Sequence, residues 1–167
     1  MNTGQTLLTI GAMVLLGTIV IGVNRNLFSN GVILTQTEVG IYAISLASSI
    51  IEEASGQNYD EVTVNDAVTA TTSLSLTLGP EAGETTNPVT TTNFDDFDDY
   101  NNLDMPTTVS GIDNFRIKAQ VVYINAANPE GSTTTPTWYK KINVSVIPTV
   151  SQDTIKMSYI FSYFNFR

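Results

Sequence analysis

One uninterrupted apolar run, Leu7 to Val23, constrains this chain more than any other feature. It carries no charge, and the first ionised side chain in the sequence is Arg25. At 1.5 Å per residue a helix over this run is about 25 Å long, close to the hydrocarbon core of a bilayer, which is about 30 Å thick. The flanking uncharged residues extend it to a full crossing. The run therefore predicts a hydrophobic, membrane-spanning helix over residues 5–26.

The run does not have the flanks of a cleaved secretory signal. Residues Met1 to Thr6 contain no Lys or Arg, and the sequence after the run is Asn24-Arg25-Asn26. A secretory signal normally has a basic start and small residues at its cleavage site. We therefore expect ordinary signal cleavage not to remove this segment.

The remainder of the chain is acidic and lacks two residue types on which many active sites depend. The net charge is −9, and all 16 Asp and Glu residues lie at or beyond Glu38. Such a surface repels nucleic acid. There is no Cys and no His, which excludes disulfides, thiolate nucleophiles, the usual zinc sites and triads with an imidazole base. No catalytic residue is expected, and 167 residues suit one domain with a membrane element.

Residues 27–56 are predicted to form an amphipathic helix. Ser29-Asn30-Gly31 is a possible break or bend near the middle of the long helix that this segment continues. Gly56 fits the position after the last helical turn. Five apolar residues recur at intervals of seven, four, three and four and so share one helical face: Val32, Val39, Ala43, Leu46 and Ile50.

Residues 57–167 are predicted to form a globular antiparallel β domain. Apolar and polar residues alternate along three runs, and shorter candidates precede them. Runs of this kind joined by turns favour a meander with one buried face, which the amphipathic helix would cover. The fold class expected is α+β, a long N-terminal helix packed on a C-terminal antiparallel sheet. The candidate strands are Glu61–Val64, Ser73–Leu78, Phe115–Ile124, Trp138–Ile147 and Ile155–Tyr163, with loops at Gly79–Asn102 and Asn125–Thr137.

Three stretches, taken in order, resemble type IV pilins and pseudopilins. Gly4-Gln5-Thr6-Leu7-Leu8-Thr9 is similar to a prepilin peptidase site. Ala43–Val62 is similar to the helix end and exit turn of prepilin-type proteins. Asn93–Leu103 (NFDDFDDYNNL) resembles the Asp-rich loop of minor pilins of the mannose-sensitive haemagglutinin type. The resemblance implies a pilin-like fold and a filament subunit, with residues 1–4 a short leader cleaved between Gly4 and Gln5.

The resemblance also implies partners and a location. The precursor would sit in the inner membrane, and prepilin peptidase and the pilus assembly machinery would pass it into an extracellular filament on the cell surface or a periplasmic pseudopilus. There its partners would be copies of itself in a helical array. The residues expected to pack in the filament core are Leu7, Leu8, Gly11, Val14, Leu15, Gly17 and Ile21.

The chain departs from the pilin pattern at Thr9, where the family places a glutamate. A threonine hydroxyl can bond to its own preceding helical turn instead, so registration between subunits would have to come from packing. In an alternative register Met1 is the mature terminus, and the amide of Gln5 takes the fifth position.

An acidic loop, residues 93–104, is the most highly charged part of the chain. Its carboxylates suit a hard cation, so the loop is a candidate calcium site, although its spacing does not match an EF-hand. The alternative is a solvated acidic loop whose Asp side chains bond to nearby backbone amides and whose aromatic residues anchor it to the domain. The candidate ligands are Asp95, Asp96, Asp98 and Asp99, and the aromatic residues are Phe94, Phe97 and Tyr100.

Two other functions remain open. One is a single-pass, membrane-anchored surface binding domain, an adhesin or sensor, that does not polymerise. The other is a membrane-tethered hydrolase, which would need an activity that depends on Asp98 or Asp99. Processing between Gly4 and Gln5 discriminates the filament subunit from the plain anchor, which would keep Met1.

Overall fold

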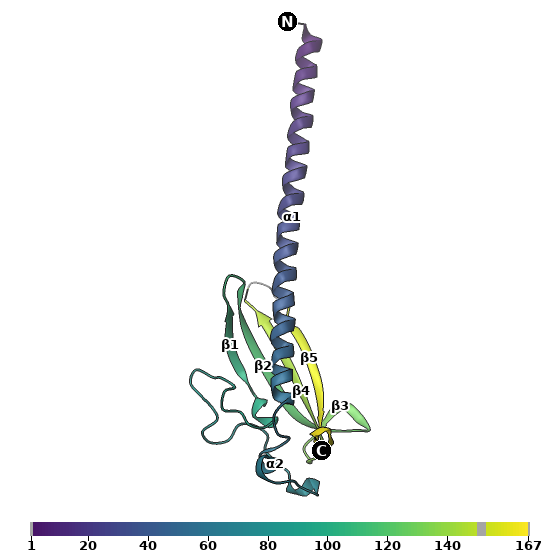
Figure 1. The fold of residues 1–167 in the computed structure, drawn as a ribbon. Coiled ribbons are helices and arrows are strands. Elements are labelled where there is room, and N and C mark those ends of the chain that lie inside the picture. The colour runs from purple at the N-terminus through teal and green to yellow at the C-terminus, as the bar shows by residue number, and fades with distance from the viewer. Residues whose placement is uncertain (1, 150–152, 167) are drawn as a thin grey trace. The chain divides into compact units, whose positions relative to one another are not determined.

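The computed structural model describes residues 2–149 and 153–166. The chain divides into two compact units, Met1–Glu38 and Val39–Arg167. The helix α1 (Thr3–Ser55) contributes to both, and the second unit also holds a short helix, α2 (Glu61–Asn65), and five strands. The predicted α+β class is confirmed (Figure 1).

The helix α1 continues through Ser29-Asn30-Gly31, where the sequence allowed a break. Glycine costs about 1 kcal/mol relative to alanine inside a helix, whereas proline costs about 3 kcal/mol. No proline occurs in α1, so these residues weaken the helix without ending it. It ends at Ser55, and the backbone amide of Gly56 donates to the carbonyls of Glu52 and Glu53 at 3.2 and 3.1 Å.

The five strands form one antiparallel sheet, in the order β1-β2-β4-β5 with β3 paired to β2. The three alternating runs in the sequence become β2, β4 and β5, which lie next to one another in the sheet. The predicted loop Asn125–Thr137 instead contains β3. The strands are β1 (Asp104–Val109), β2 (Asp113–Asn125), β3 (Asn128–Thr133), β4 (Tyr139–Pro148) and β5 (Ile155–Ser162).

The last part of α1 covers one face of the sheet (Figure 1). Alternation along β2 places Phe115, Ile117, Ala119, Val121 and Tyr123 in the core, and Ile142, Val144 and Val146 of β4 join them. The helix contributes the buried residues Val39, Ala43, Ala47, Ile50 and Ala54. The three alanines let the helix axis approach the sheet closely, because each adds only one carbon beyond the backbone.

The predicted helical face is confirmed at Val39, Ala43 and Ile50, and Leu46 is half-buried. It is wrong at Val32, whose side chain is 57% exposed. Val32 belongs to the first unit, before the unit that holds the sheet, so its side chain is not part of that core.

Two short strand predictions are wrong. Residues Glu61–Val64 belong to α2, because Asp60 and Thr63 form a capping box: the Asp60 amide donates to the Thr63 hydroxyl at 2.9 Å, and Asp60 accepts from the Val62 amide. Ser73 ends the 3-10 turn Thr71–Ser73, and residues Ser73–Leu78 pair with no strand of the described sheet.

Candidate functional site

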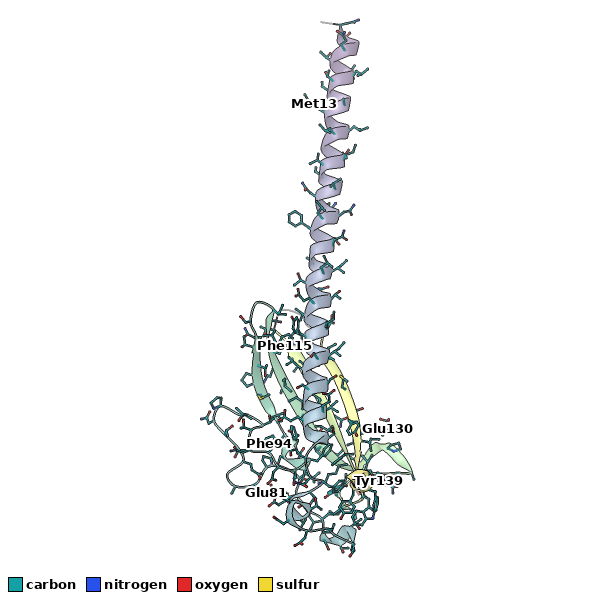
Figure 2. All side chains as sticks on the ribbon, in the orientation of Figure 1. Met13, Glu81, Phe94, Phe115, Glu130 and Tyr139 are labelled. Atoms are coloured by element: carbon teal, nitrogen blue, oxygen red, sulfur yellow. The ribbon has the colours of Figure 1, made fainter. Side chains whose placement is uncertain are left out.

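The first unit presents a long, fully exposed apolar surface. Its large apolar side chains stand out on all sides of α1, as Figure 2 shows around Met13. Within the described residues α1 is long and apolar enough to cross a membrane, with a mean hydropathy of 2.3 over its best window, none of it buried. The side chains more than half exposed are Leu7, Leu8, Ile10, Met13, Val14, Leu15, Leu16, Ile19, Val20, Ile21, Val23, Leu27, Phe28, Val32, Ile33 and Leu34.

No neighbouring atom of the described residues requires glycine at positions 11, 17 or 22. A β-carbon added at any of them would meet nothing within 4 Å in the described structure. Each glycine weakens an isolated helix, so the protomer itself gains nothing from having glycine there. Small residues on an apolar helix allow close approach of a second helix.

The hydroxyl of Thr9 bonds to its own helix, as the sequence predicted. It donates to the carbonyls of Thr6 and Gln5, at 2.9 and 3.2 Å. Gly4 and Gln5 lie exposed in the first turn of α1, and Met1 lies outside the described residues. The hydrogen-bonding capacity of the Thr9 hydroxyl is therefore satisfied within α1, without a charged partner.

A buried lysine, Lys140, lies at the centre of the second unit. It occupies the core face of β4 and is 0% exposed. Its ammonium donates to the Tyr59 carbonyl at 2.6 Å, to Asp60 Oδ2 at 2.9 Å and to Asp98 Oδ1. It also lies 4.5 Å from the centroid of the Tyr59 ring. Three acceptors match the three donors of an ammonium, so Lys140 joins the exit of α1, the acidic loop and β4.

Asp60 and Asp98 share this ammonium but differ in environment. Burial alone would raise the pKa of Asp60, but Lys140 and the hydrogen bonds from Ser75 outweigh burial and lower it. Ser75 donates through its amide and its hydroxyl, and Tyr123 donates its hydroxyl at 3.0 Å. Burial raises the pKa of Asp98, although Lys140 opposes the shift. The charged form of Asp60 is therefore the better stabilised of the two carboxylates.

The interpretation of the acidic loop as solvated is wrong. Asp96, Asp98 and Asp99 are each 1% exposed or less, and Phe94, Phe97 and Tyr100 are buried with them. The expected bonds to backbone amides are present. Asp96 Oδ1 accepts from the amides of Asp98 and Asp99, and Asp99 Oδ2 accepts from those of Asp95 and Asp96, at 2.7 to 3.1 Å. The loop is an integral part of the domain core.

Three segments bring their carboxylates together beside this loop. In each of three groups, the carboxylate oxygens lie within 4.8 Å of one another: Glu61, Glu84 and Asp95; Glu61, Glu81 and Asp96; Glu81, Glu84 and Asp99. We call these six residues the carboxylate cluster. Asp98, a sequence-predicted ligand, belongs to none of the three groups and faces Lys140. Glu61, Glu81 and Glu84 carried no sequence signal, because they lie 9 to 32 residues before the start of the acidic loop along the chain.

The surroundings of the cluster disfavour the charged forms of Glu81, Asp96 and Asp99. Burial raises the pKa of Asp96 to about 9, of Glu81 to about 7 and of Asp99 to about 6, and neighbouring acids add to the shifts of Asp96 and Glu81. Among the described residues no hydrogen-bond partner reaches Glu81 Oε2, Asp96 Oδ2 or Asp99 Oδ1, all of them buried. A proton shared between neighbouring carboxyls can satisfy them, since side-chain hydrogen bonds with Glu84 and Asp98 contribute to the raised pKa values of Glu81 and Asp96.

Comparisons with protein-family models, with curated proteins and with solved structures find no match to this chain. The class that the fold defines is an α+β domain carried on a long apolar helix compatible with membrane anchoring. The functional interpretation rests on the residues and their geometry.

Proposed function

We propose that the chain is a structural subunit of a type IV pilus-like or pseudopilus filament, assembled through its N-terminal hydrophobic helix. The observation that carries the proposal is the length of exposed apolar surface on α1. From Leu7 to Leu34 this surface extends about 40 Å at 1.5 Å per residue. A bilayer covers about 30 Å.

An anchor alone therefore leaves part of this surface uncovered. A bilayer over residues 5–26 excludes Leu27, Phe28 and Leu34, which are among the most exposed apolar side chains of the unit. These side chains lie beyond the polar residues Asn24 to Asn26, and an exposed apolar patch of this kind marks an interface. Other copies of the same helix supply a cover of matching length and chemistry, and Gly11, Gly17 and Gly22 give them room to approach.

In this proposal α1 has two successive environments. The precursor is held in the inner membrane, prepilin peptidase cleaves between Gly4 and Gln5, and the assembly machinery transfers the subunit into the filament. The subunits then repeat one head-to-tail contact that does not close, which gives a helical fibre. Threonine has no charge to offer a neighbouring subunit, and the Thr9 hydroxyl already bonds to its own helix. Registration between subunits therefore comes from apolar packing.

The alternative is a single-pass anchored adhesin or sensor, and intact-mass measurement of the native protein separates the two. A filament subunit loses Met1 to Gly4 and is present in fibres sheared from cells. A plain anchor keeps Met1 and stays in the membrane fraction. Retention of Met1 together with the absence of fibres would overturn the filament proposal.

Two variants test the apolar surface beyond the bilayer. Leu34→Glu places a charge on it, and Gln36→Glu adds the same side chain two residues away without removing an apolar contact; both positions are exposed on α1. We expect Leu34→Glu to abolish sheared fibres while the protein stays in the membrane fraction, and Gln36→Glu to keep them. If both variants assemble equally well, Leu34 is not at an interface between subunits and the central observation fails.

A further inference from the structure

We propose that Lys140 and Asp98 condense to an intramolecular amide bond, with Asp60 as the base that transfers a proton in the step. The link is a covalent modification that the chain makes by itself: Lys140 Nζ joins Asp98 Cγ and one water is released. It connects β4 to the acidic loop, 42 residues earlier in the chain. All three residues lie in the second unit, so the proposal does not depend on filament assembly.

The reacting groups are already in contact. Lys140 Nζ donates to Asp98 Oδ1 and lies 2.9 Å from Asp60 Oδ2. The side chains of all three residues are 1% exposed or less, and they come from three segments that pack together in the core. A nucleophile held against its target in one geometry reacts as though its concentration were about 10⁵–10⁸ M. A condensation that is unfavourable between free groups in water is therefore feasible here.

The surroundings favour a neutral product over two charges. Lys140 Nζ lies 4.5 and 5.2 Å from the ring centroids of Tyr59 and Tyr123. Phe161, the cross-strand partner of Lys140, is buried and stacks on Phe97 with ring centroids 4.7 Å apart. A buried ammonium and a buried carboxylate each lose their hydration, which is costly. An amide bond removes both charges, and its burial keeps it from the water that would hydrolyse it.

The two carboxyls beside Lys140 differ in the way that the reaction requires. Asp60 accepts from the amide and hydroxyl of Ser75 and from the Tyr123 hydroxyl, and hydrogen bonds of this kind stabilise a carboxylate, the basic form. Burial raises the pKa of Asp98, which makes its neutral form accessible, and an amine attacks a neutral carboxyl. Asp98 is therefore the electrophile and Asp60 the base.

Every bond and proton in the step is accounted for. The Lys140 ammonium passes one proton to Asp98 along their hydrogen bond, which leaves a neutral amine and a carboxylic acid. The amine nitrogen attacks Asp98 Cγ, and Asp60 takes a second proton from the nitrogen. Asp60 then gives this proton to the departing hydroxyl, so that a C–N bond has formed, a C–O bond has broken and one water leaves. Asp60 ends as the carboxylate, and the step needs no oxidant, reductant or co-reactant.

Mass measurement of the full chain, denatured and digested with trypsin, tests the link. Trypsin should not cut between Lys140 and Lys141, and the peptide 26–116 should be joined to the peptide 119–141. The joined pair should be about 18 Da lighter than the sum of its parts, the mass of the water lost on amide formation. Lys118 is the internal control: it lies 3.6 Å from Asp104 in an exposed pair, and trypsin should cut after it. Loss of Met1 to Gly4 changes only the peptide 1–25, so leader cleavage and the link are measured separately.

Three variants assign the roles. Asp60→Asn keeps an oxygen for the Ser75 donors but removes the base, so its peptides should stay unlinked. Asp98→Asn offers an amide nitrogen as the leaving group, so its link should release ammonia, about 17 Da, instead of water. Lys140→Met removes the nucleophile, and with it the contact in both its ionic and its covalent form, so no mass should be lost.

Three results would overturn the proposal. The first is a wild-type chain whose peptides are unlinked and have the masses of their sequences, which decides the matter even if a variant fails to fold. The second is a linked Asp60→Asn that has lost ammonia, because the bond would then lie at position 60. The third is the same loss of water in Lys140→Met, which would show dehydration elsewhere in the chain.

Discussion

Replacement of Lys140 by methionine should destabilise the second unit far more than replacement of an exposed lysine. Lys140→Met keeps a long apolar stem but removes the ammonium that bonds to the Tyr59 carbonyl, Asp60 and Asp98. Asp60 keeps its donors from Ser75 and Tyr123, whereas Asp98 loses its counter-charge while buried. Removal of one partner from a buried pair costs roughly 3–5 kcal/mol, which lowers the melting temperature of a domain of this size by roughly 10–15 °C.

The assay is thermal and urea unfolding of the full chain in detergent, followed by Trp138 fluorescence. Lys118→Met is the matched control, because the Lys118 side chain is 50% exposed and lies 3.6 Å from Asp104. An exposed pair of this kind contributes less than about 1 kcal/mol. Lys140→Met/Asp98→Leu should recover part of the loss, since it also removes the uncompensated carboxylate. If Lys140→Met unfolds within about 0.5 kcal/mol of Lys118→Met, the buried ammonium does not hold these segments together.

Three further outcomes follow from named contacts. Without metal, the melting temperature should fall as pH rises from about 5 to 9: the raised pKa values of Glu81 and Asp96 mean that the folded state holds protons the unfolded state has lost. Circular dichroism melts across this range check it, and a rising curve would contradict it. Ala47→Leu should cost about 1–3 kcal/mol by forcing α1 from the sheet, whereas Ser49→Leu, at an exposed position, should cost little; equal urea midpoints would contradict close packing at Ala47. Thr9→Val should leave sheared fibres intact, because the hydroxyl bonds within its own helix; loss of fibres would show that it registers neighbouring subunits.

Local periodicity was sufficient to predict the central part of the domain. Alternation over Phe115–Ile124 and Trp138–Ile147 identified both the strands and their buried faces, because each strand has one face on the core. The same alternation extended one step back from Ile142 reaches Lys140, so the sequence did contain a signal for its burial. Lysine is rarely buried, and for this reason the prediction did not place Lys140 in the core despite its position in the alternation.

The parts that were missed depend on contacts between distant segments. The sequences of β1 and β3, DMPTTV and NPEGST, are polar and contain proline, and such strands form because β2 offers a partner. Glu61–Val64 alternates like a strand, but the Asp60 cap begins a helix there. Glu81 joins Asp96 only after the loop Gly79–Asn102 has folded back, and no local pattern encodes that return. Chain spacing therefore suggested the Asp-rich loop alone as the candidate cation site.

Asp60 and the acidic loop together bury more carboxyl groups than Lys140 can neutralise. Asp60, Asp96, Asp98 and Asp99 are each 1% exposed or less, and the other buried lysine, Lys141, bonds to the Pro129 carbonyl, outside the cluster. An uncompensated buried carboxylate is costly. The single ammonium bonds to Asp60 and Asp98 together, and Asp60 also accepts from Ser75 and Tyr123. The remaining carboxyls need protons or a cation to neutralise them. The stability of the folded loop therefore depends on whether these are bound.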